Sequence, residues 1–215
     1  LATDLERIGD TEAAIAYYHQ ALALKPDFYE AWAVLGICYC DLGIFNRAVD
    51  CSYKAITIRP DCFVAYNTLG RVYQQQGELD KAFEQFTQAL KIKPDYHEPY
   101  NFIGLIYIQK DELDSALEFF QKAIEIKHTY AEAYNNCGVT HALRGELEEA
   151  IFCFLKALEY KTKYVEAYYN LASAYDESNQ PEKAEAYEKQ AEELEIQELE
   201  EFKRRKNIID GIIGE

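Results

Sequence analysis

Small apolar residues recur along the chain with a fixed spacing of 34 positions. Alanine fills two columns without exception, and a third column always holds glycine or alanine. These columns are Ala14, Ala48, Ala82, Ala116, Ala150 and Ala184; Ala21, Ala55, Ala89, Ala123, Ala157 and Ala191; and Ala2, Gly36, Gly70, Gly104, Gly138 and Ala172. A period of this length predicts a stack of similar supersecondary units, because a single globular fold has no reason to repeat in register.

Each period contains two amphipathic helical patterns. The first is a stripe at helical spacing, for example Tyr66, Leu69, Gly70 and Tyr73. The second begins after Gly77 and comprises Leu79, Ala82, Phe83, Phe86, Ala89 and Leu90. The small columns mark the places where two helix backbones approach closely.

Turn and stop residues separate these patterns. Residues that tolerate turn geometry predict reversals at Gly9, Gly43, Gly77, Asp111, Gly145 and Asn179. Prolines predict the end of each second helix near Pro26, Pro60 and Pro94, whereas His128 and Thr162 replace proline and predict softer ends.

The sequence therefore predicts an all-α fold, an α-solenoid of stacked antiparallel helix pairs with a long C-terminal helix. The expected array covers residues 1–198, in units 1–28 (partial), 29–62, 63–96, 97–130, 131–164 and 165–198, and an extension covers residues 199–215. The first unit lacks its opening residues, so a further repeat before Leu1 is an open expectation. Glu185, Glu188 and Glu192 replace apolar residues of the earlier units, which predicts a polar cap on the last unit.

These columns resemble the tetratricopeptide repeat family. Tyr66, Leu69, Gly70, Tyr73, Ala82, Phe86, Ala89 and Pro94 stand in the order and spacing of that family, and the match repeats over about residues 1–198. The resemblance implies a right-handed superhelix whose concave surface is lined by the first helix of each unit. It also implies protein or peptide partners, without naming one.

Composition narrows the function classes. The net charge of −16 disfavours nucleic acid as a partner. The six cysteines lack zinc spacing and are expected to be reduced core residues, which favours the cytoplasm. No motif for a nucleophile, a metal or a phosphate-binding loop is present, so we expect no enzyme, no cofactor and no membrane segment.

The polar positions of the first helices are the candidate site. They predict a peptide-binding groove made of Asn67, Arg71, Gln74, Asn101, Leu105, Asn135, Asn136, Asn170 and Asp176. Asn67, Asn101 and Asn135 repeat at the full period, and amides in register can bind the backbone of an extended peptide. This pattern is similar to the asparagine ladders of O-GlcNAc transferase.

Two alternatives stay open at this point. The amides could be ordinary polar residues on a wet face. The chain could also be an architectural subunit that self-associates or docks through its convex face or its C-terminal helix, where Ile208, Ile209, Ile212 and Ile213 form an apolar cluster.

Overall fold

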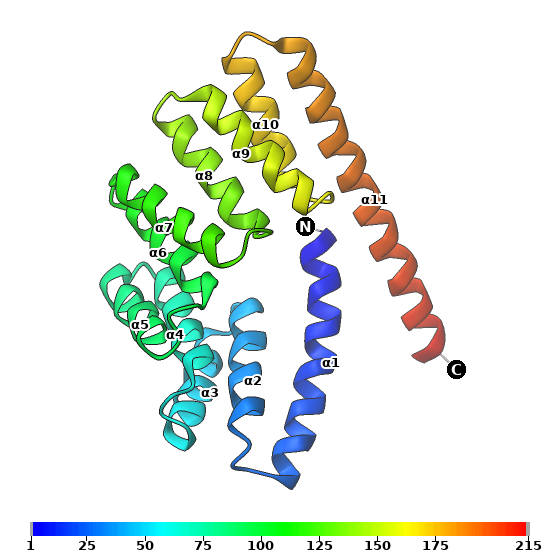
Figure 1. Cartoon of the computed structure of the whole chain (residues 1–215). Coiled ribbons are helices and arrows are strands. Elements are labelled where there is room, and N and C mark those ends of the chain that lie inside the picture. Colours follow the sequence, from blue (N-terminus) through cyan, green and yellow to red (C-terminus); the bar gives the residue numbers. More distant parts are fainter. Residues whose placement is uncertain (1, 214–215) are drawn as a thin grey trace. The chain divides into compact units, whose positions relative to one another are not determined.

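The protein is described by a computed structural model in which the backbone of residues 2–213 and the side chains of residues 11–201 and 203 are defined (Figure 1). The isoleucines of the predicted terminal cluster lie outside the described side chains. Within the described backbone, all regular secondary structure is α-helical. The chain forms two compact units, which we call the N-terminal unit (Ile8–His128) and the C-terminal unit (Thr129–Glu215, with Leu1–Arg7).

The N-terminal unit consists of helices joined in antiparallel pairs. Its helices are α1 (Ala2–Leu24, from Ile8 on), α2 (Tyr29–Asp41), α3 (Phe45–Ile58), α4 (Phe63–Gln75), α5 (Leu79–Ile92), α6 (His97–Gln109) and α7 (Leu113–Ile126). The pairs α2–α3, α4–α5 and α6–α7 pack internally, and α3 packs on α4 and α5 on α6. The first helices also touch one another, α2 with α4 and α4 with α6.

The C-terminal unit repeats this plan. It contains α8 (Ala131–Leu143), α9 (Leu147–Tyr160), α10 (Val165–Glu177) and α11 (Pro181–Ile213). The pairs are α8–α9 and α10–α11, with α9 packed on α10 and α8 touching α10. The all-α solenoid predicted from the sequence is confirmed. No described helix is both long and apolar enough to cross a lipid bilayer.

The predicted reversals are confirmed at five of six positions. Gly43, Gly77, Asp111, Gly145 and Asn179 all have φ between 58° and 77°, the left-handed region that glycine and asparagine tolerate best. The reversal predicted at Gly9 is wrong, because α1 continues through it. Extending a formed helix costs less than starting a second one.

Proline is not needed to end the second helices. α3 and α5 end two residues before Pro60 and Pro94, as predicted. α7 and α9 also have 14 residues each, although His128 and Thr162 replace the proline. The position of the break therefore does not depend on proline.

A glycine–phenylalanine contact holds each of three helix pairs together. A Cβ atom added to Gly70, Gly104 or Gly138 would lie 2.5 Å from the ring of Phe86, Phe120 or Phe154 respectively. The three rings are at most 1% exposed. Each such ring contributes about 2–3 kcal/mol through burial alone, and the space that it occupies exists only because glycine has no side chain.

The α2–α3 pair departs from this arrangement. Ser52 stands at the repeat position of the three phenylalanines and faces Gly36, whose added Cβ would lie 2.8 Å from the serine Oγ. Ser52 is fully buried, and its hydroxyl has no hydrogen-bond partner among the described residues. This pair therefore lacks the aromatic ring and carries the cost of an unsatisfied polar group.

The polar cap predicted at the end of the array is confirmed. Glu185, Glu188 and Glu192 are exposed on α11, while Ala184 and Ala191 of the same helix are buried against the unit.

We expect Gly104→Ala to lower the free energy of unfolding by about 1–3 kcal/mol, because its methyl group would overlap a rigid, buried ring. The matched control is Gly36→Ala, which meets only a serine hydroxyl that can rotate away. Urea denaturation followed by circular dichroism measures both. Equal losses for the two variants would contradict the role of the aromatic ring.

The raised pKa values of two thiols predict a fold that is less stable at alkaline pH. Burial raises the pKa of Cys51 from 9.0 to about 11, and it raises the pKa of Cys153 equally. A raised pKa means that the folded state holds the proton more tightly, so this stability is complete below pH 9 and is lost as pH rises towards 11. We expect the urea midpoint to fall over that window, and to fall less in the Cys51→Ala/Cys153→Ala variant. Parallel curves for the two proteins would refute this account.

Candidate functional site

The candidate residues of the N-terminal unit lie on its first helices, where several of them connect one helix to the next. Asn67 and Asn101 are only 3% and 4% exposed. The Asn67 amide Nδ2 donates to Glu98 Oε2 at 3.1 Å and to the Tyr96 hydroxyl at 3.2 Å. These amides therefore lie inside the packing of the helices and are not displayed on a wet face.

Arg71 of α4 is engaged on both sides. Its guanidinium donates to Asp41 Oδ1 of α2 at 2.5 Å and lies 5.7 Å from the centre of the Phe102 ring of α6. This arginine, which the sequence suggests as a ligand-binding cation, holds three successive first helices together. Gln74 and Leu105 are partly buried nearby on α4 and α6.

In the C-terminal unit the asparagines form a connected chain of hydrogen bonds. Asn135 is fully buried, and its Nδ2 donates to Glu166 Oε1 at 3.3 Å. Asn170 Nδ2 donates in turn to Asn135 Oδ1 at 3.0 Å. The columns of the sequence did not pair these two residues. Asn136 is partly buried on α8, and Asp176 is exposed on α10.

These hydrogen bonds show why the amide oxygen of Asn135 has a donor and that of Asn67 has none among the described residues. Phe102 stands at the repeat position of Asn170, and it stacks on Phe86 with 5.3 Å between ring centres. A phenyl ring donates no hydrogen bond, so Asn67 Oδ1 is buried without a partner among the described residues. In the C-terminal unit Asn170 stands at this repeat position and donates to Asn135 Oδ1.

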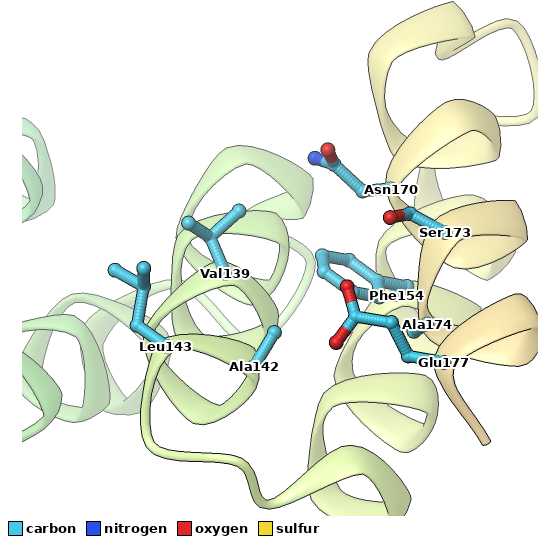
Figure 2. A pocket seen from close by; sticks show the side chains of 8 residues that line it. All are labelled: Val139, Ala142, Leu143, Phe154, Asn170, Ser173, Ala174 and Glu177. Carbon is cyan, nitrogen blue, oxygen red and sulfur yellow. The ribbon is translucent and has the colours of Figure 1, made fainter.

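A cavity of about 190 Å³ opens between α8 and α10 of the C-terminal unit (Figure 2). Val139, Ala142 and Leu143 of α8 form an apolar wall, and Phe154 of α9 closes the back. The α10 wall is more polar. It consists of Asn170, Ser173, Ala174 and Glu177, and the Glu177 carboxylate points into the space.

Two substitutions within the repeat explain why the cavity exists. Leu143 and Ser173 stand three repeat lengths after Asp41 and Arg71. Between α2 and α4 the long arginine fills the gap and pairs with the aspartate. Between α8 and α10 a short serine leaves the gap open, and leucine gives it an apolar wall.

A second hollow of about 470 Å³ lies between α10 and α11 and shares Ser173 with the first. Its acidic side chains are Asp176, Glu185 and Glu188, and Tyr169 lines it as well. The C-terminal unit thus presents an apolar cavity beside an acidic hollow. Among the candidates from the sequence, Asn170 lines the first and Asp176 lines the second.

Family models match most of the chain. Models described as "Tetratricopeptide repeat" match residues 2–28, 28–95 and 165–195, and one described as "TPR repeat" matches residues 104–143 and 141–178. The chain belongs to the tetratricopeptide repeat family. No curated protein is a significant match to this tetratricopeptide repeat chain.

Solved structures share the tetratricopeptide fold. MamA is 25% identical with a TM-score of 0.63, over 77% of this chain and 96% of MamA. Cut9 in the APC/C hetero-tetramer Cut9–Hcn1 gives 0.79 at 22% identity, over 90% of this chain and 38% of the other. YrrB, a TPR protein with an unusual peptide-binding site, gives 0.56 at 21% identity, over 82% and 91%. Tetratricopeptide arrays are in general non-catalytic protein-interaction scaffolds.

Leu143 and Ser173 could have been found from the repeat columns. The column of Leu143 otherwise holds Asp41, Gln75, Gln109 and Glu177, so leucine is its one apolar member. Ser173 is the smallest residue in a column that holds Ile37, Arg71, Leu105 and Val139. Departures from a column therefore indicate the cavity, which the repeated asparagines do not.

Among the described residues, no group of three or more histidine, cysteine or acidic side chains is arranged to hold a metal ion. His141 is partly buried and pairs with Glu146, with 2.7 Å between Nδ1 and Oε2.

We expect Asn170→Ala to lower the free energy of unfolding by about 1–3 kcal/mol, because Asn135 Oδ1 would be buried without a donor. The matched control is Ser173→Ala, three residues along the same helix, which removes an exposed hydroxyl and gains similar helix propensity. Chemical denaturation compares the two. A loss no larger than that of the control would show that the hydrogen-bond chain adds no stability.

Proposed function

We propose that this protein is an interaction scaffold that holds an extended segment of a partner protein against its first helices, with the cavity between α8 and α10 as the anchoring site. The observation that carries the proposal is the opening made by Leu143 and Ser173. An ion pair fills the junction between α2 and α4. The corresponding junction between α8 and α10 is open and has an apolar wall.

The cavity has the properties of an anchor pocket. Leu143 is 59% exposed and lies beside Val139 and Ala142, so the wall offers a contiguous apolar surface to a ligand. A few buried apolar anchors dominate the affinity of most protein interfaces. The neighbouring Asn170 can accept a hydrogen bond from the backbone of an extended segment, the usual partner of a peptide-binding surface.

The other candidate residues keep a supporting role in this proposal. Asn67, Asn101 and Asn135 are buried, so they would shape the inner faces of their helices instead of touching the ligand. Gln74, Leu105, Asn136 and Asp176 are at least partly accessible and remain predicted contacts. Binding by YrrB, a peptide-binding TPR protein, supports the class of ligand by analogy of fold.

A second function is favoured by the outer face of α9. Phe152 and Leu155 are 58% and 40% exposed there. The same repeat positions hold Glu84 and Thr87 on α5, and Glu118 and Gln121 on α7. An architectural subunit that docks through this convex face would explain why apolar residues replace polar ones on α9. Cut9 is an example of this fold within an assembly.

The remaining expectations accompany the proposal. The net charge of −16 supports a protein partner over a nucleic acid, because phosphates would be repelled. A role without catalysis or cofactor, in the cytoplasm, stays a prediction, as does self-association.

The test restores the ion pair that the earlier repeat contains. Random fifteen-residue peptides are screened on an array against the full chain, and dissociation constants of the hits are measured by fluorescence anisotropy. We expect Leu143→Asp/Ser173→Arg to weaken binding at least tenfold, because it closes the cavity in the manner of Asp41 and Arg71.

The control for this test is Phe152→Glu/Leu155→Gln, which gives the convex face of α9 the residues of α7. It should leave peptide binding unchanged. Hits that bind the closed variant as tightly as the wild type would refute the cavity as the anchor, and loss of binding in the α9 variant would favour the convex face.

A further inference from the structure

The polar rim of the cavity presents hydrogen-bond acceptors to a ligand. Glu166 as a carboxylate only accepts, so Asn135 must turn its Nδ2 towards it. Asn135 Oδ1 is then left to receive Nδ2 of Asn170. The Glu166 carboxylate therefore fixes the orientation of both amides. Asn170 Oδ1 is the acceptor that is left to face the cavity.

Carboxylates in and beside the cavity also favour a ligand that carries hydrogen-bond donors. Glu177 points into the cavity, and Asp176, Glu185 and Glu188 line the adjoining hollow. None of these four forms an ion pair with another described residue. Their carboxylates are therefore available to pair with a cation on a ligand.

The two spaces lie side by side because Ser173 lines both. A dry cavity of about 150 Å³ accommodates a benzene molecule, so the space of about 190 Å³ suits one leucine, isoleucine or phenylalanine side chain. In an extended segment, residues two apart project to the same face about 6–7 Å from each other. An apolar side chain in the cavity would thus place its second neighbour over the acidic hollow.

We propose that this site selects a segment of a partner protein in which a large apolar residue is accompanied, two or three positions away, by lysine or arginine. The apolar wall of α8 receives the first side chain, and the carboxylates of α10 and α11 receive the cation. This inference rests on the proposed function and specifies its ligand. The negative charge surrounding the site also raises the rate of encounter with basic segments.

The test uses three pools of extended eleven-residue peptides with a fixed central leucine. The pools carry arginine, glutamine or glutamate two positions after the leucine and are otherwise random in serine, glycine and alanine. Anisotropy titrations with the full chain are run at low and high salt. We expect the arginine pool to bind about fivefold more tightly than the glutamine pool, which is the upper range for an exposed ion pair, and the glutamate pool to bind most weakly.

Two variants localise the effect. Glu177→Lys should remove or invert the order of the arginine and glutamate pools. Glu148→Lys, a charge reversal of the same size on the exposed first turn of α9, should leave the order intact. High salt should shrink the difference between pools, because the pairs are open to solvent.

The outcomes separate this inference from the function on which it rests. If the three pools bind equally and Glu177→Lys changes nothing, the preference for a cation is refuted while the anchor cavity stands. If no pool binds, and the array also finds no ligand, both are refuted.

Sedimentation of the full chain checks whether a second copy is the occupant. The chain has one basic and isoleucine-rich segment of its own, at residues 203–213. A dimer that disappears in Leu143→Asp/Ser173→Arg and on removal of residues 203–215 would refute the assignment to a partner protein. A monomer throughout supports it.

Discussion

The contact between a glycine and a phenylalanine ring sets the geometry of the helix pairs. Without a side chain on Gly70, Gly104 or Gly138, the ring of the facing helix reaches the backbone and locks the distance between the two axes. Protein interiors are packed as densely as organic crystals, so such a contact tolerates little change. The alanine columns complete the close approach, and the larger aromatic side chains fill the spaces around it.

This constraint fixes the small and aromatic core columns of each repeat and leaves the other positions free to differ. The variable positions include the inner face of the first helices, where Arg71 corresponds to Ser173 and Asp41 to Leu143. The same framework therefore contains a closed, ion-paired junction in one unit and an open cavity in another. The shape of this face is therefore set by the absence of a long side chain as much as by the side chains that are present.

The core could be predicted from the sequence because its residues contact others that lie close in the sequence, and because its small-residue columns recur six times. The turns at Gly77 and Asn179, for example, needed only local conformational preference. The inner face was harder to predict. Whether Asn67 faces solvent depends on Glu98 and Tyr96, which approach it only when the next repeat is stacked. The cavity was harder still, because its only sign in the sequence is a departure of Leu143 and Ser173 from their repeat columns. Gly9 shows the opposite limit, since its turn preference was outweighed by continuation of a helix.

Ser52 makes the helix pairs of the N-terminal unit unequal in stability. In a linear array each helix pair is stabilised by itself and its neighbours, so a defect remains local and does not spread through a common core. The α2–α3 pair lacks the ring that secures α4–α5 and α6–α7, and it buries an unpaired hydroxyl. Opening of the native state should therefore begin at this pair, with the later pairs still folded. One missing phenyl ring thus gives a nearly uniform repeat a preferred place to come apart.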